Sequence, residues 1–213
     1  MQVIGLTGSS GAGKSVAASI FKKQGIPVID ADCVYHEILG AGGDCTKELA
    51  EAFGTTVLDQ NGLISRQALA DTVFGKPNTD TLLHTLNTIT HKYVMSEIKK
   101  RLRWLKENGA KAAVIDAPLL FEANAHLECD FVIGVVADRA LRAERIMARD
   151  GISKEHAEKR LQAQKSDEFY RLRCDYILEN NTDTKDFRLA LENLLKKTGV
   201  LRDCVRKEPK NTL

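Results

Sequence analysis

Residues 8–15 read Gly-Ser-Ser-Gly-Ala-Gly-Lys-Ser and match the full phosphate-binding loop pattern G-x-x-x-x-G-K-[ST]. An apolar run at residues 2–6 precedes this loop and a helical pattern at residues 16–21 follows it, which is the strand–loop–helix setting that the motif requires. Its glycines let backbone N–H groups turn toward phosphate oxygens, and the helix N-terminus adds partial positive charge. In such a loop Lys14 reaches the β- and γ-phosphates of a nucleotide and the Ser15 hydroxyl ligates Mg²⁺. We expect the Lys14 side chain to face solvent when no nucleotide is bound. The alternative interpretation is an ordinary glycine-rich turn.

Two carboxylates, Asp30 and Asp32, directly follow a second apolar run at residues 27–29. Ligands of parallel sheets bind at the carboxyl ends of strands, where a carboxylate can accept the proton of an acceptor hydroxyl or hold Mg²⁺ through water. Residues two apart in an extended strand do not share all their neighbours, so we expect different roles. We predict chemistry for Asp32 and a structural role for Asp30, with the N-cap of a helix at residues 31–39 as the non-catalytic alternative.

Asp116 is a third candidate carboxylate, because it ends the apolar run at residues 113–116. This position suits a Walker B-like partner of Mg²⁺. The next residue is Ala117 and not the glutamate often found in hydrolysing ATPases. The metal role of Asp116 is therefore left open.

Ten basic residues lie between Arg139 and Arg173. A helix is predicted at residues 139–149, with Asp138 as its N-cap and Gly151 as its stop. Arg142, Arg145 and Arg149 share one face of that helix, at spacings i, i+3 and i+7. One interpretation is a solvated, salt-bridged surface. The other is a mobile lid whose arginines close over a triphosphate and stabilise the transferring group.

The elements that must position these residues alternate between short strands and helices, which predicts an α/β fold. Apolar, unalternating runs predict five strands of a parallel sheet that is covered on both faces, at residues 2–6, 27–29, 113–116, 131–136 and 176–178. The first helix should run from Lys14 to about Gln24 and stop at Gly25. Helical periodicity also marks residues 46–53, 66–74 and 79–107, which predicts an insertion with a core of its own. The final stretch, Arg202–Leu213, is polar and should be frayed.

The bulk composition fits a single α/β domain in a soluble, cytoplasmic enzyme. The chain has 213 residues and a net charge of +2, so charge gives no indication of a nucleic-acid partner. It has no run of 18 apolar residues and no signal-peptide pattern, so we expect no membrane association. Its five cysteines, one of them Cys204, are scattered without C-x-x-C pairs and read as reduced thiols, so the sequon at residues 180–182 should be unused.

Other classes of phosphate-loop protein lack their signatures here. A GTPase needs Asn-Lys-x-Asp to read guanine, and the sequence has none; the loose D-x-x-G match at residues 59–62 is not specific. The Leu-Ser-Gly-Gly-Gln signature of transporter ATPases is also missing. A small P-loop kinase remains. We expect its core at residues 1–32, 110–138 and 174–200, an acceptor-binding helical insertion at 33–109 and a helical lid at 139–173.

The chain resembles the dephospho-coenzyme A kinase family from residue 3 to about residue 181. The matching stretches occur in family order and with family spacing: residues 4–15, Gly25-Ile-Pro-Val-Ile-Asp-Ala-Asp32, Pro118-Leu-Leu-Phe-Glu122, Arg145-Ile-Met-Ala-Arg-Asp150 and Asp175-Tyr-Ile-Leu-Glu-Asn180. The combination of Val-Ile-Asp-Ala-Asp with Pro-Leu-Leu-Phe-Glu is the most specific part.

The resemblance implies transfer of the γ-phosphoryl group of ATP, with Mg²⁺, to the ribose 3′-hydroxyl of dephospho-CoA. It implies that Asp32 is the base facing this hydroxyl, that Arg145 touches the ATP phosphates, and that Thr7 and His91 lie near the acceptor. With Lys14 and Arg145, Asp32 completes the expected catalytic set. The expected ATP-binding residues are Gly8, Gly11, Ala12, Gly13, Lys14, Ser15, Val16 and Arg145.

The chain departs from the family pattern at four places. The loop is not Gly-Gly-Ile-Gly-Ser-Gly-Lys, although it keeps the glycines that the motif requires, and Val16 replaces a common threonine. Lys92 follows His91 where the family usually has proline, which affects the expected local turn. Arg142 stands where glutamine is usual, which affects the expected lid packing or adenine contacts. None of these changes removes a charge that the chemistry needs.

Two alternatives remain open from the residues alone. The first is a kinase of another small hydroxyl acceptor, such as a nucleoside. The second is a nucleotide-dependent switch protein that binds ATP or GTP without a small acceptor. The oligomeric state is not indicated by the sequence.

Overall fold

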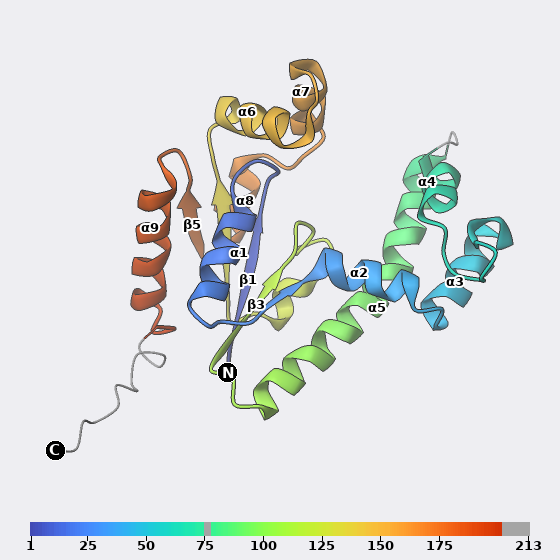
Figure 1. Ribbon diagram of the computed structural model, residues 1–213, viewed down its shortest axis with the longest axis horizontal. Coiled ribbons are helices and arrows are strands. Elements are labelled where there is room, and N and C mark those ends of the chain that lie inside the picture. The colour runs from blue at the N-terminus through green and yellow to red at the C-terminus, as the bar shows by residue number, and fades with distance from the viewer. Residues whose placement is uncertain (75–77, 202–213) are drawn as a thin grey trace. The chain divides into compact units, whose positions relative to one another are not determined.

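The computed structural model describes residues 1–74 and 78–201 (Figure 1). The expectation for Arg202–Leu213, and Cys204 within it, lies outside the described residues. By contacts between Cα atoms, the chain divides into two compact units. The first contains Met1–Val28 and the chain from Leu105 onward, and the second is Ile29–Trp104.

A five-stranded parallel sheet forms the centre of the fold, as predicted. The strand order is β2-β3-β1-β4-β5, so the first strand lies in the middle. In register, Leu6 of β1 is opposite Asp116 of β3, and Gly8 is opposite Val135 of β4. The strands are β1 (Gln2–Gly8), β2 (Val28–Asp30), β3 (Ala112–Asp116), β4 (Phe131–Val136) and β5 (Tyr176–Glu179), within one or two residues of the predicted runs.

The end of β1 needs glycine for steric reasons. Gly8 has a φ of +152°, and a Cβ there would lie 2.3 Å from the carbonyl oxygen of Val135. The close approach of β1 and β4 therefore excludes any side chain at the residue where the strand turns into the phosphate loop.

Helices α1 (Lys14–Lys23) and α9 (Thr184–Lys197) bury their apolar faces in the core of the sheet. Phe21 of α1 and Phe187 of α9 belong to one buried cluster with Leu6 and Ile133 of the strands. Figure 1 shows α9 beside β5. Helix α1 ends where predicted, since Gly25 follows with a left-handed φ of +73°.

Three helices separate β4 from β5: α6 (Arg139–Asp150), α7 (Lys154–Gln162) and α8 (Asp167–Arg173). Ala143 and Ile146 of α6 pack on Ala157 and Leu161 of α7 in a small core, and the two helices lie side by side in Figure 1. Gly151 stops α6 in the left-handed region, as predicted.

Asp138 is the N-cap residue of α6, as predicted, but its side chain forms no capping hydrogen bond. Its carboxylate instead accepts from Asn181 Nδ2 at 3.0 Å. In return, Asn181 Oδ1 accepts the backbone N–H of Asp138 at 2.8 Å. The reciprocal pair with the chain after β5 satisfies the carboxylate, so Asp138 ties the start of α6 to β5.

The second unit contains α2 (Ala31–Gly40), α3 (Asp44–Phe53), a short 3₁₀ helix (Thr55–Val57), α4 (Arg66–Phe74) and most of α5 (Thr79–Glu107). It has its own buried cluster, as the periodicity of the segment predicts. This cluster contains Leu39, Cys45, Leu49, Val57, Ile64, Leu69, Val73, Leu86 and Ile89.

Two sequence features of this unit have structural explanations. The Asp59–Gly62 match to D-x-x-G is a tight turn, in which Asp59 Oδ1 accepts the N–H groups of Asn61 and Leu63. Helix α5 continues through Lys92, so the departure from the His-Pro pattern produces no break. Lys92 Nζ instead pairs with Glu48 of α3 at 2.7 Å.

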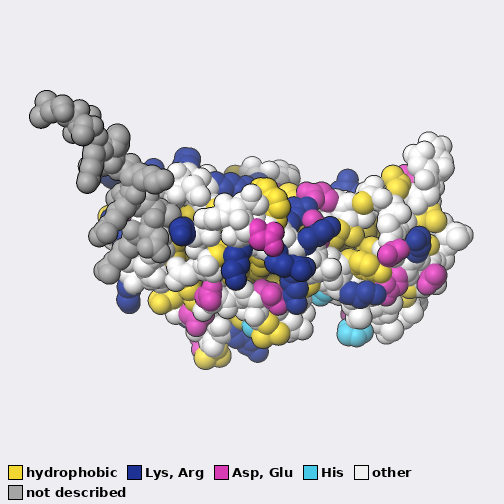
Figure 2. Space-filling view, turned by 90° about the horizontal axis from the view of Figure 1, so that it is seen from below, with side chains coloured by type: hydrophobic (Ala, Val, Ile, Leu, Met, Phe, Trp, Pro, Cys, Tyr) yellow, Lys and Arg dark blue, Asp and Glu magenta, His cyan; other side chains and the backbone are white. Residues whose placement is uncertain are grey.

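The surface mixes charges of both signs. On the face shown in Figure 2, Lys and Arg side chains lie among Asp and Glu side chains, in keeping with the small net charge. Among the described helices, none is long and apolar enough to cross a membrane.

Candidate active site

Two more glycines, both with left-handed φ angles, set the backbone path of the phosphate loop between β1 and α1. Gly11 has a φ of +78°, and a Cβ there would lie 2.7 Å from the carbonyl oxygen of Arg142. Gly13 has a φ of +104°, and its Cβ would lie 2.1 Å from Asn180 Nδ2. These glycines therefore serve both the backbone conformation and the close packing of α6 and the chain after β5 against the loop.

Three successive carbonyl groups of the loop are held from outside it. The Ser10 carbonyl accepts from Arg142 Nε at 3.3 Å, and the Gly11 carbonyl accepts from Arg145 Nη1 at 3.3 Å. The Ala12 carbonyl accepts from Asn180 Nδ2 at 2.8 Å. In a trans peptide the C=O and the next N–H point in opposite directions, so each of these bonds also orients an N–H.

The loop keeps backbone donors for an anion. Within residues 1–74 and 78–201, no protein acceptor is bonded to the N–H groups of Gly11, Gly13, Lys14 or Ser15. The last two belong to the first turn of α1, where helical N–H groups carry partial positive charge. This is the arrangement that the loop motif predicts for phosphate binding.

Lys14 does not face solvent freely, contrary to the expectation from sequence. Its ammonium forms an ion pair with Asp116 Oδ1 at the end of β3. The side chains of Lys14 and Asp116 are 21% and 7% exposed, so the pair is largely buried. Because Leu6 and Asp116 are register partners, the sheet itself places this carboxylate beside the loop.

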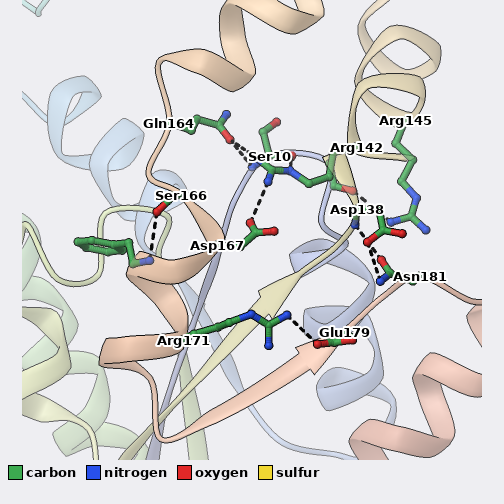
Figure 3. Close-up of polar contacts among 12 residues, drawn as sticks. Ser10, Asp138, Arg142, Arg145, Gln164, Ser166, Asp167, Arg171, Glu179 and Asn181 are labelled. Atoms are coloured by element: carbon green, nitrogen blue, oxygen red, sulfur yellow. Dashed lines mark hydrogen bonds and ion pairs between the residues drawn. The ribbon is translucent and has the colours of Figure 1, made fainter. Parts of the chain in front are cut away.

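The three arginines that share a face of α6 all reach the loop. Figure 3 shows Arg142 among Ser10, Gln164 and Asp167, and shows Arg145 farther along the helix. Arg145 Nη2 also donates to the Asn180 carbonyl at 3.0 Å. Arg149 is mainly exposed and pairs with Asp150, although its Nη2 donates to Ser10 Oγ at 3.3 Å. A purely solvated surface is therefore wrong for this face.

Burial and ion pairs shift three pKa values around this helix. Burial lowers the pKa of the Arg142 guanidinium, and the Asp167 carboxylate opposes that shift. A hydrogen bond from Arg149, with Arg160 nearby, lowers the pKa of Asp150 to about 2. Burial raises the pKa of Tyr170, which lies on α8. The Asp167 carboxylate thus favours the charged form of Arg142 beside the loop.

Sequence reasoning missed three side chains that hold the loop: Gln164 and Asn180 bond to it directly, and Asp167 acts through Arg142. Gln164 follows α7 and Asp167 begins α8, in the segment between β4 and β5, and neither carries a recognisable sequence pattern. In the sequence, Asn180 was noticed only within a stretch that matches the family and within the sequon at residues 180–182. Gly13 is the signal that could have pointed to such a side chain, because a position that requires glycine implies that another group packs closely against it.

The residues predicted to act on the acceptor belong to different surroundings. Asp30 caps α2, since its Oδ1 accepts the N–H groups of Asp32 and Cys33 at 2.9 and 3.0 Å, which confirms the structural alternative for this residue. Asp32 is exposed in the first turn of α2, and His91 is half-buried on α5. Thr7 is fully buried and donates to the Pro118 carbonyl at 3.3 Å.

Comparison with known proteins gives consistent relatives. The family model described as dephospho-CoA kinase matches residues 2–186. A dephospho-CoA kinase of Lactobacillus johnsonii is 35% identical over 196 residues, which cover 92% of this chain and 98% of that protein.

Solved structures agree with these relatives. A Thermus thermophilus protein has a TM-score of 0.74 and 32% identity, with 92% of this chain and 97% of that chain covered. A dephospho-CoA kinase from Campylobacter jejuni has a TM-score of 0.68 and 26% identity, with coverages of 95% and 100%.

Lys14→Ala should reduce turnover by roughly 10³-fold, because the ammonium neutralises phosphate charge in the ground and transition states. The variant should also melt at a lower temperature than the wild type, since the largely buried ion pair between Lys14 and Asp116 is lost. Turnover and melting temperature measure the two effects. Lys22→Ala, an exposed position on the same helix, is the control. Turnover within about tenfold of wild type would contradict the phosphate-loop assignment.

Arg145→Ala should lower kcat by roughly 10²-fold and change KM for ATP less, if this arginine leaves the carbonyls of Gly11 and Asn180 to meet the transferring group. Arg149→Ala should have a smaller effect, because its side chain is mainly solvated and paired with Asp150. Steady-state kinetics with varied ATP separate the two constants. Equal, small effects of both substitutions would mean that this face has no catalytic arginine.

Proposed function

The chain belongs to the dephospho-CoA kinase family, and we propose that it transfers the γ-phosphoryl group of ATP to the 3′-hydroxyl of dephospho-CoA, giving CoA and ADP. This is the last step of CoA biosynthesis. The observation that carries the proposal is the phosphate loop, with three of its carbonyls held by Arg142, Arg145 and Asn180, in a chain matched to the family over residues 2–186.

Each group of the loop has a defined task in this reaction. The N–H groups of Gly11, Gly13, Lys14 and Ser15 would bind phosphate oxygens, and the Lys14 ammonium would exchange Asp116 for the β- and γ-phosphates. Gly8, Ala12 and Val16 would complete the ATP site by shaping the backbone around it. Because the phosphoryl transition state is loose, this positioning and the positive charge supply most of the catalysis.

The donor set fits Mg²⁺ bound largely through the nucleotide. Among the described residues, no group of three His, Cys, Asp or Glu side chains forms a metal cage. Mg²⁺ is typically held by one or two protein oxygens together with phosphates and water. Ser15, exposed at the start of α1, would supply a hydroxyl ligand, and the Asp116 carboxylate lies next to Lys14. When bound, the ion would neutralise charge on the phosphates.

Asp32 is our proposal for the group that orients the acceptor hydroxyl and takes its proton. Its carboxylate is exposed at the start of α2, and the neighbouring Asp30 is already committed to capping that helix. His91 and Thr7 are proposed to lie near the acceptor, with Thr7 acting through the shape of the β1 terminus, since its hydroxyl is bonded to Pro118.

We also propose a cytoplasmic location and small-molecule partners only. Cys33, Cys45, Cys129 and Cys174 are free, as expected in a reducing compartment. Burial raises the pKa of Cys129 and of Cys174 to about 12, which keeps both thiols protonated and unreactive.

The test is mass spectrometry of the acceptor after incubation with MgATP. A mass gain of one phosphoryl group on dephospho-CoA, with ADP formed in equal amount, is the expected result. Nucleosides serve as competing acceptors in parallel reactions. Phosphorylation of a nucleoside but not of dephospho-CoA would assign another acceptor, and slow ATP hydrolysis that ignores every acceptor would indicate a switch protein.

Asp32→Asn should lower kcat by about 10²–10⁴-fold with nearly unchanged ATP affinity, because it keeps size and hydrogen bonding but removes the proton acceptor. Asp30→Asn should lower the melting temperature as well as activity, because it weakens the cap of α2. The measurements are kcat, ATP affinity and melting temperature for both variants. Loss of turnover in a stable Asp30→Asn protein, with an active Asp32→Asn protein, would reverse the assignment.

A further inference from the structure

Arg142 is a buried cation within the lid segment, and its side chain is only 7% exposed. Its guanidinium donates in three directions: Nε to the Ser10 carbonyl, Nη1 to Asp167 Oδ1 at 2.9 Å and Nη2 to Gln164 Oε1 at 3.3 Å. We propose that Arg142 is a positioning residue, which with Gln164 and Asp167 fixes the orientation of the Ser10 peptides and so prepares the loop for ATP.

The two peptide groups that flank the Ser10 Cα are held by one network. The N–H of Ser10 donates to Gln164 Oε1 at 3.0 Å, and the same oxygen accepts from Arg142. The carbonyl of Ser10 accepts from Arg142 Nε. Figure 3 shows these contacts converging on Ser10. Neither peptide can rotate without breaking one of these bonds.

The orientation of these peptides decides what the loop presents to a phosphate. The Ser10 carbonyl and the Gly11 N–H belong to one trans peptide and point in opposite directions. Because Arg142 holds the carbonyl, the Gly11 N–H of the same peptide is directed away from Arg142. Rotation of this peptide would replace a donor by a carbonyl oxygen, which repels phosphate. Glycine at position 11 makes such a rotation conformationally accessible, so the loop needs an external restraint.

A structural role alone does not explain a guanidinium at this place. Burying a charge is costly unless the charge is paired and its hydrogen-bond donors are satisfied. An apolar side chain of similar length would fill the same volume without that cost. What arginine adds is a rigid fork of donors that reaches a backbone carbonyl, a carboxylate and an amide together.

The inference rests on the proposed function, because it concerns the ATP site of the same reaction. A restraint that is present before ATP binds contributes equally to the ground state and the transition state. Its loss should therefore weaken ATP binding and raise KM for ATP, while kcat changes little. This separates Arg142 from Arg145, for which the larger effect is expected in kcat.

The experiment compares Arg142→Met, Arg142→Lys and Asp167→Asn with the wild type. Methionine keeps a long apolar stem without donors, and lysine keeps the charge without the fork. Arg142→Met should raise the dissociation constant of MgATP, measured by calorimetric titration without acceptor, by roughly tenfold or more. Arg142→Lys should be intermediate. Asp167→Asn should weaken binding less than Arg142→Met, and the double variant should be less than additive.

Arg139→Met is the matched control, because Arg139 lies on the same helix, is half exposed and pairs with Glu158 of α7 and not with the loop. Unchanged MgATP affinity in Arg142→Met, or a loss equal to that of Arg139→Met, would overturn the inference. So would a fall in kcat and melting temperature at constant affinity. If the wild type binds MgATP but phosphorylates no dephospho-CoA, the proposed function fails, while the affinity comparison still tests Arg142.

Discussion

Before a nucleotide binds, the shape of the phosphate loop depends on hydrogen bonds that hold three of its carbonyl groups. Arg142, Arg145 and Asn180 hold the carbonyls of Ser10, Gly11 and Ala12. A loop rich in glycine has many conformations, and ordering it is costly. Hydrogen bonds from α6 and from the chain after β5 offset part of that cost in the folded protein. The phosphate site is therefore built by residues more than a hundred positions away from the loop.

The central place of β1 explains how such distant residues meet. Paired with β3 on one side and β4 on the other, this strand brings the loop beside Asp116 and Val135 at the same edge of the sheet. Strand β5 pairs with β4, so Asn180 and Asn181, which directly follow β5, lie at that edge. Asn181 then fixes the start of α6 through Asp138. Strand order therefore sets where the arginine face of α6 lies, because the hydrogen bonds between Asp138 and Asn181 connect the start of this helix to the chain after β5.

The strands, most helices and the loop could be predicted because their signals are local. Apolar runs mark β1 and β4, and Gly25 and Gly151 stop α1 and α6 by a conformation that glycine favours. Pairings across the fold could not be read in this way. The sequence has no feature that joins Lys14 to Asp116 or Arg142 to Asp167, since each pair forms only when the sheet assembles. Asp138 shows the same limit: its type and position suit a helix cap, but a better partner lies beyond β5.

The three arginines of α6 differ in burial and therefore in the roles that they can take. Burial decreases along this face from Arg142, which is almost fully enclosed, through the half-buried Arg145 to the exposed Arg149. A guanidinium bound to a carboxylate and an amide in the interior has no low-cost alternative, so Arg142 is fixed. Within the described part of the chain, Arg145 donates to two neutral carbonyls, at 3.3 and 3.0 Å, and a triphosphate is a stronger acceptor than either. One turn of helix therefore separates a cation that must stay in place from a cation that can exchange its partners for a phosphate.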